Sequence, residues 1–265
     1  MAMLELSKVA RVYRKGDNEV RALDGVDLFI EAGEFLAIVG PSGSGKTTML
    51  NILGCLDSPS SGTIVYDGTD LHGLDEKALS AYRRDRISFV FQSYNLIPVL
   101  TVRENVELPL VIEARARGRS SKDGAPFATK TRSDAEIKAL ALEMLEAVGL
   151  GGKADRFPRE LSGGQEQRVA IARALVKKPL VVLADEPTAN LDSRTAGEIL
   201  DLMRDINEKK GATFIFSTHD HMVMERARRI VTLHDGQIAS DTTSRIATAD
   251  SAPGGISDTT SHGRS

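Results

Sequence analysis

The glycine-rich loop at residues 40–47 constrains the fold of this chain more than any other part of the sequence. It reads GPSGSGKT, which fits the pattern G-x-x-x-x-G-K-[ST], and it lies between the apolar run FLAIV and the helix-forming run TTMLNIL. Glycines let backbone N–H groups wrap around phosphates, and the following helix N-terminus adds a partial positive charge. Strand, loop and helix in this order predict a βαβ unit. The expected phosphate-binding residues are Gly40, Pro41, Ser42, Gly43, Ser44, Gly45, Lys46, Thr47 and Thr48.

Two acidic residues end the apolar run LVVLADEP at residues 180–187. An acidic pair alone is usually a solvated strand end, but beside a phosphate-binding loop it indicates a magnesium and water site. Lys46 would reach the β- and γ-phosphates, and the Thr47 hydroxyl would bind Mg²⁺. We expect Asp185 to be the acidic magnesium ligand and Glu186 to be the base that polarises the attacking water.

The remaining sequence divides into segments of different character. Residues 4–40 alternate short apolar stretches with charged turns, which predicts an antiparallel β region. Residues 93–165 are rich in helix formers, and EIKALALEMLEAVGL carries its apolar residues at helical spacing, so a helical subdomain is expected there. From residue 179, PLVVLAD and ATFIFST alternate with the helical stretch RTAGEILDLMRDINEKK, which is typical of a parallel sheet. We therefore expect an α/β domain over residues 1–240.

Two segments are expected to lie outside the packed structure. Residues 114–134 have a net charge of +4 with interspersed small residues, which favours a solvated insertion loop. Residues 241–265 are rich in Ser and Thr and contain no aromatic residue, so they offer too little apolar surface to offset the entropy of ordering. We expect them to form a disordered tail.

Composition excludes several other classes. The apolar runs are much shorter than the roughly 20 residues that a membrane-spanning helix needs. The single cysteine excludes an internal disulfide, and the first residues lack the pattern of a signal peptide, so a cytoplasmic location is expected. A net charge of −3 gives no reason to expect nucleic-acid binding.

A second glycine motif, LSGGQ at residues 161–165, precedes the helical run QEQRVAIARALV. A Ser-Gly-Gly turn that opens a helix is another phosphate-binding N-terminus. One subunit has no evident use for two such sites on a single γ-phosphate. The expected residues of this second site are Ser162, Gly163, Gly164 and Gln165.

With these motifs in this order, residues 3–240 resemble the nucleotide-binding subunit of ABC transporters, in which LSGGQ completes the ATP site of a partner subunit. The resemblance implies a RecA-like parallel core with an N-terminal antiparallel β subdomain and an α-helical subdomain. It also implies that Tyr13 stacks on adenine, that Gln92 lies near Mg²⁺ and the attacking water, that Asp192 belongs to the D-loop, and that His219 contacts the γ-phosphate. Glu166 departs from the Gln that many relatives carry there.

Longer stretches are similar to the macrolide-exporter and lipoprotein-release branch of that family, for example AYRRDRISFVFQSYNLIPVLTVRENVELPL. The resemblance implies an ATP hydrolase that forms a head-to-tail dimer with a second nucleotide-binding domain. It also implies a membrane permease as partner, which attaches the chain to the inner face of the membrane. The alternatives are an ABC-type ATPase acting in DNA repair or on ribosomes, a module that binds ATP without hydrolysing it, and a small-molecule kinase, which would not explain LSGGQ.

Overall fold

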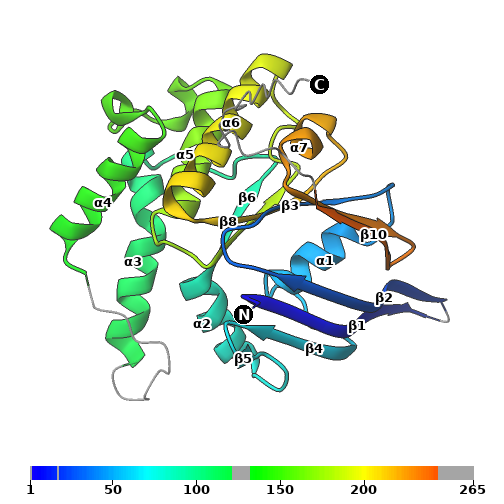
Figure 1. Ribbon diagram of the computed structural model, residues 1–265. Coiled ribbons are helices and arrows are strands. Elements are labelled where there is room, and N and C mark those ends of the chain that lie inside the picture. Colours follow the sequence, from blue (N-terminus) through cyan, green and yellow to red (C-terminus); the bar gives the residue numbers. More distant parts are fainter. Residues whose placement is uncertain (1, 17, 121–131, 244–265) are drawn as a thin grey trace, which may run out of the picture.

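The computed structural model describes residues 2–16, 18–120 and 132–243, which form two sheets and a layer of helices (Figure 1). The larger sheet has the strand order β10-β9-β3-β8-β7-β6. Its strands β3, β6, β7, β8 and β9 are parallel, and β10 pairs antiparallel with β9. The bounds are β3 (Phe35–Val39), β6 (Ile87–Phe91), β7 (Val181–Asp185), β8 (Thr213–Ser217), β9 (Arg229–His234) and β10 (Gln237–Thr243).

The smaller sheet is antiparallel, with the strand order β2-β1-β4-β5. Its strands are β1 (Leu4–Lys15), β2 (Asn18–Ile30), β4 (Ser61–Tyr66) and β5 (Thr69–Asp70). The N-terminal antiparallel region and the parallel core expected from the sequence are both present. The α/β fold is therefore confirmed.

The strands β3, β7 and β8 of the six-stranded sheet are buried on both faces, and each face belongs to a different hydrophobic core. Along β3, Leu36 and Ile38 point into the core shared with the small sheet, whereas Phe35 and Ala37 point into the core shared with the helical layer. This division follows from the two-residue side-chain period of a strand. Helix α1 (Lys46–Leu53) lies between the two sheets.

The other face carries the helical layer. Helices α3 (Val102–Ser120), α4 (Asp134–Ala147), α5 (Gly163–Leu175), α6 (Ser193–Lys210) and α7 (His221–Arg226) cover it. The short helices α2 (Glu76–Arg86), η1 (Gly151–Lys153) and η2 (Pro158–Glu160) complete the fold. Helices α1 and α5, which begin at the two glycine motifs, thus pack on opposite faces of one sheet.

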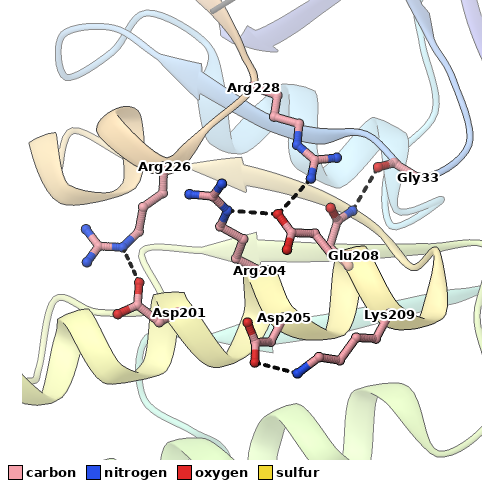
Figure 2. A network of polar contacts seen from close by, with 9 residues as sticks. Gly33, Asp201, Arg204, Asp205, Glu208, Lys209, Arg226 and Arg228 are labelled. Atoms are coloured by element: carbon pink, nitrogen blue, oxygen red, sulfur yellow. Dashed lines mark hydrogen bonds and ion pairs between the residues drawn. The ribbon is translucent and has the colours of Figure 1, made fainter. Parts of the chain in front are cut away.

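Figure 2 shows a polar network between helix α6 and the region where α7 ends and leads into β9. Glu208 accepts from both Arg204 Nε at 3.0 Å and Arg228 Nη2 at 2.9 Å. Arg226 Nε donates to Asp201 at 2.8 Å. At the end of α6, Asn207 Nδ2 donates to the carbonyl oxygens of residues 33 and 212, at 2.8 and 2.7 Å. The helix therefore keeps a fixed position against the sheet.

Two expectations about unstructured segments are partly wrong. Residues 114–120 continue helix α3 rather than beginning a loop, and residues 121–131 lie outside the described part of the chain. Residues 241–243 belong to β10, where Asp241 forms a two-bond ion pair with Arg229; residues 244–265 lie outside the described part. Within residues 2–16, 18–120 and 132–243, no helix combines the length and the apolar character needed to cross a membrane.

Candidate functional site

An open cleft of about 920 Å³ lies where β3, β7 and β8 end and α1 begins. Ligands of open α/β sheets bind at this edge, beyond the carboxyl ends of the strands. The cleft brings together Pro41, Ser42, Gly43, Gly45, Lys46, Thr47, Thr48, Gln92, Asp185, Glu186 and His219, with Gly40 at its base. Residues far apart in the sequence thus share one concave surface.

The loop at residues 40–47 is held tightly against its surroundings. A Cβ atom on Gly40 would lie 2.2 Å from the carbonyl oxygen of Leu233, and one on Gly45 would lie 2.4 Å from that of Ala22. The Lys46 ammonium donates to the carbonyl oxygens of Gly40 and Pro41 at 2.8 and 2.9 Å. Only glycine fits at residues 40 and 45, and the Lys46 cation lies across the opening of the loop.

Ser44 is placed differently from the other residues of this loop. Its side chain is buried beneath the loop, and it is not among the residues that line the cleft. Its backbone N–H donates to Pro41 at 3.2 Å, and its carbonyl oxygen accepts from Gly236 at 3.1 Å. In this geometry Ser44 shapes the loop, and its hydroxyl does not face the cleft.

Asp185 is the last residue of β7 and is half-buried at the floor of the cleft. Burial raises the pKa of this carboxyl, and the negative charge of Glu186 raises it further. A hydrogen bond with Ser217 and the positive charge of Lys46 act in the opposite direction. A cation close to Asp185 would relieve the cost of holding this charge away from water.

Glu186 follows directly in a left-handed backbone conformation, with φ of 45°. Its Oε1 lies 2.7 Å from Nδ1 of His219, and its Oε2 accepts from the Thr218 hydroxyl at 3.0 Å. A carboxylate only accepts hydrogen bonds, so this contact requires the histidine tautomer with its proton on Nδ1, and it does not use Nε2. The side chain of His219 is 79 % exposed, whereas that of Glu186 is 19 % exposed. Glu186 is therefore the more buried and fixed member of the pair, and His219 is the exposed member.

Gln92, the residue directly after β6, is hydrogen-bonded to the segment after β7. Its Nε2 donates to Asn190 Oδ1 at 3.3 Å, and Asn190 Nδ2 donates back to the Gln92 carbonyl oxygen at 3.0 Å. Farther along, Arg173 of α5 donates to the backbone carbonyl oxygens of Tyr94 and Asn95 at 2.7 and 2.5 Å. Hydrogen bonds therefore connect Gln92 to the segment after β7, and the residues after Gln92 to helix α5, which begins at the second glycine motif.

The second glycine motif lies away from the cleft. Ser162 precedes α5 as its N-cap residue, and Gln165 Oε1 accepts from the Ser162 N–H at 3.2 Å. A Cβ atom on Gly164 would lie 2.4 Å from Cγ2 of Thr195, and one on Gly163 would lie 3.0 Å from the Tyr94 hydroxyl. Neither glycine nor its neighbours in the motif line the cleft. This helix start is a separate surface, on the far side of the sheet from α1.

Asp192 and Tyr13 also lie outside the cleft lining. Asp192 is the N-cap residue of α6, and its side chain accepts from the Thr195 backbone N–H at 3.0 Å and from the Thr195 hydroxyl at 2.6 Å. These hydrogen bonds lower the pKa of Asp192. Tyr13 pairs with Val20 across β1 and β2, and Val20 does line the cleft.

Several residues of the site were missed by sequence reasoning. Ser217 is hydrogen-bonded to Asp185, and the Thr218 hydroxyl donates to Glu186. Both residues directly precede His219 at the end of an apolar run, and this position could have identified them as site residues. Arg21 and Asp235 at the rim come from β2 and from the turn after β9. No local pattern distinguishes those two from other surface charges.

The chain is similar to known proteins in sequence and in fold. Residues 23–189 match the family described as ABC transporter. The chain is 45 % identical over 251 residues to the macrolide export ATP-binding/permease protein MacB of Hyphomonas neptunium, covering 95 % of this chain and 36 % of that protein. It is 45 % identical over 237 residues to the uncharacterized ABC transporter ATP-binding protein MJ0796 of Methanocaldococcus jannaschii, covering 89 % of this chain and 95 % of that protein.

The fold matches a solved structure as well. A dimeric, post-hydrolysis structure of the ATP-binding cassette MJ0796 bound to ADP and Pi superposes with a TM-score of 0.77 at 43 % identity, covering 91 % of this chain and 98 % of that one. The chain spans about a third of the length of the MacB proteins it matches, 36 % and 34 % in two of them.

Proposed function

This chain belongs to the ABC transporter family, and on that premise we propose that it binds and hydrolyses ATP as one half of a dimer that drives a membrane permease. The observation that carries the proposal is the placement of the two glycine motifs. Helix α1 begins in the cleft, whereas no residue of the second glycine motif, which opens α5, lines it, so within one chain only the first motif borders a phosphate group bound there. A second chain, placed head to tail, supplies the missing half.

In the proposed dimer, the cleft of one chain faces Ser162 and Gly164 of the other. The phosphate groups are bound by the loop at residues 40–47, and the exposed N–H groups at the start of α5 close over the γ-phosphate. MJ0796, at 43 % identity, has been solved as a dimer, which supports this assembly. ATP bound between the chains favours the closed dimer because it contacts both of them.

Glu186 is the proposed base. Its carboxylate takes a proton from a water molecule as the water oxygen attacks the γ-phosphorus, and ADP leaves with the bridging oxygen. The hydrogen bonds from His219 and Thr218 fix the orientation of the carboxylate, and each of its oxygens keeps a further lone pair for the water. Nε2 of His219, the ring nitrogen that does not contact Glu186, is proposed to contact the γ-phosphate.

A magnesium ion fits the oxygen atoms present in the cleft. The Thr47 hydroxyl, the Asp185 carboxylate and the Gln92 side-chain carbonyl oxygen are hard donors of the kind that Mg²⁺ prefers beside phosphates. The raised pKa of Asp185 indicates a carboxylate that gains from a nearby cation. Bound there, the ion would neutralise phosphate charge, and Lys46 would supply a second positive charge in the same cleft.

The permease is proposed to contact a groove beside the Gln92 segment. A cavity of about 590 Å³ is bordered by Leu56, Phe89, Phe91, Ile112 and Arg173. Leu56 and Ile112 are 50 % and 48 % exposed. Val99, which lies seven residues after Gln92 in the sequence, is 77 % exposed. Through Arg173 and the Gln92–Asn190 pair, motion of this groove is transmitted to the ATP cleft. Peripheral attachment to the inner face of the membrane follows if the permease binds here.

Replacing Glu186 with Gln tests the proposal. The amide cannot take the proton, so turnover should fall by roughly 10²–10⁴-fold while ATP binding persists. Size-exclusion chromatography with Mg-ATP should then show a stable dimer of Glu186→Gln and a monomer without nucleotide. Glu198→Gln is the matched control, because Glu198 is half-exposed on α6, where it pairs with Arg168 and Arg194, and it does not line the cleft. Undiminished hydrolysis by Glu186→Gln would refute the assignment of the base.

A further inference from the structure

Three side chains outside the cleft lining form a closed polar cluster around an aromatic ring. The Tyr13 hydroxyl donates to Asp57 Oδ2 at 2.7 Å, and Arg11 Nη2 lies 2.7 Å from Asp57 Oδ1. The Arg11 guanidinium carbon is 4.7 Å from the centroid of the Tyr13 ring. One carboxylate therefore holds the hydroxyl of the ring and also the cation that covers the ring.

The cluster orders a ring that remains accessible. Arg11 and Asp57 are 24 % and 22 % exposed, so their ion pair is less screened by solvent than the usual surface pair. The Tyr13 residue is 38 % exposed. Arg11 Nε is buried and has no hydrogen-bond partner among the described residues, which is an unusual cost for a purely structural pair.

The cluster is linked to the phosphate loop through helix α1. Asp57 lies four residues beyond the last residue of α1, and its N–H donates to the carbonyl oxygen of Asn51 within that helix at 3.2 Å. The first residue of the same helix is Lys46. The carboxylate that fixes the Tyr13 ring is thus positioned by the helix that carries the phosphate-binding lysine.

Strand pairing places the ring beside the cleft. Tyr13 is directly opposite Val20 in the β1–β2 ladder, and Val20 lines the cleft. Residues directly opposite each other in antiparallel strands carry their side chains on the same face of the sheet. The Tyr13 ring therefore lies on the same face of the small sheet as the side chain of Val20, a residue of the cleft lining.

We infer that Arg11 and Asp57 are positioning residues that hold the Tyr13 ring ready to stack on the purine base of the bound nucleotide. The inference rests on the proposed function. A ring whose hydroxyl and one face are already fixed loses little conformational freedom when a base stacks on it, and this preorganisation tightens binding. The cluster acts on the base alone, so it should leave the binding of the phosphates unchanged.

The test compares two ligands that differ by the nucleoside. Dissociation constants for Mg-ATP and for magnesium tripolyphosphate are measured by calorimetry on Glu186→Gln protein of residues 1–265, with and without Asp57→Ala. Asp57→Ala should weaken ATP binding by about tenfold, equivalent to 1.4 kcal/mol, and should leave tripolyphosphate binding unchanged. Asp57→Asn keeps an oxygen acceptor for the Tyr13 hydroxyl and should recover most of the ATP affinity.

Two controls make the result specific. Asp27→Ala removes an aspartate that pairs with Lys8 on the same sheet, and it should change neither constant. Combining Tyr13→Phe with Asp57→Ala should weaken ATP binding no more than Asp57→Ala alone, because both remove the same hydrogen bond.

An unchanged ATP constant in Asp57→Ala would overturn the inference, and so would an equal loss of ATP and tripolyphosphate binding, which would show an effect through α1. If the Glu186→Gln protein bound neither ligand, the proposed function itself would be refuted. Thermal unfolding of each variant confirms that the comparison is made between folded proteins.

Discussion

The substitution Gly164→Ala tests how closely the second glycine motif packs on helix α6. A Cβ atom at residue 164 would lie 2.4 Å from Cγ2 of Thr195, whereas carbon atoms attract each other best at about 3.5–4.0 Å. Thr195 cannot turn away freely, because its hydroxyl donates to Asp192 at 2.6 Å. The backbone of α5 or of α6 must therefore shift.

The expected cost follows from two opposing effects. Overpacking of this kind costs about 1–3 kcal/mol. Alanine in place of glycine gains at most about 1 kcal/mol of helix propensity, and less at a helix start. Overpacking wins, so we expect Gly164→Ala to lower the free energy of unfolding by about 1 kcal/mol in urea denaturation at pH 7.

Thr195→Ser provides the decisive comparison, because it removes the offending methyl group and keeps the hydroxyl bonded to Asp192. In that background Gly164→Ala should become neutral or stabilising, with a coupling free energy of about 1–3 kcal/mol in the double-mutant cycle. In the proposed dimer the N–H groups at the start of α5 approach a phosphate group, and a methyl group at residue 164 would hinder that approach. ATP hydrolysis should therefore be low in Gly164→Ala and should remain low in the double variant. Equal effects of Gly164→Ala in both backgrounds would refute the packing argument.

Three further substitutions give distinct results. Lys46→Ala removes a cation from the phosphate loop and should weaken Mg-ATP binding by roughly 10–150-fold in calorimetry; Lys209→Ala, which breaks an exposed pair with Asp205, is the control and should change nothing. Burial raises the pKa of Asp185, and the protonated acid cannot bind a cation, so Mg-ATP binding should begin to decline at a pH above the ordinary pKa of 3.8 as the solution is acidified. Asp185→Asn should remove that decline. A decline that persists in Asp185→Asn would show that another group causes it. The hydrogen bonds from Arg229 lower the pKa of Asp241, so their stabilisation is present above pH 3.8 and is lost as the pH falls through the lowered pKa. Asp241→Asn should therefore cost about 1 kcal/mol at pH 7, allowing for partial exposure of the pair, and progressively less in acid; equal stability at pH 7 would contradict this role.

The parts of the fold that could be predicted are those in which a local pattern determines the structure. FLAIV and VVLAD are apolar throughout because both faces of these strands are buried, and they identify β3 and β7. The loop at residues 40–47 has glycine at residues 40 and 45 because backbone carbonyl oxygens of other segments leave no room there for a Cβ atom. Lys46, Asp185 and Glu186 follow from the same patterns, and they do line one cleft.

The parts that were missed depend on contacts distant in the sequence. Helix α2 buries only Tyr82 and is otherwise mostly polar, so it has few of the apolar residues by which a helix is recognised in a sequence. The N-cap bond from Ala78 N–H to Asp75 is its clearest local signal. The polar strand β10 depends on pairing with β9 and on the Arg229 contact with Asp241. The burial of Ser44 depends on a turn nearly 200 residues away, at Gly236.

The central claim is that one ATP site is built from two chains. Site-directed cross-linking tests it most directly, because the only native cysteine, Cys55, is buried and can be replaced by Ala. One batch of Glu186→Gln protein carries Ser42→Cys in the phosphate loop, and a second batch carries Ser162→Cys. The account predicts that mixing the batches with Mg-ATP and a mild oxidant gives a disulfide-linked pair of unlike chains, and that omitting ATP prevents it. No cross-link with ATP, or an equally efficient link within a single chain that carries both cysteines, would contradict the account.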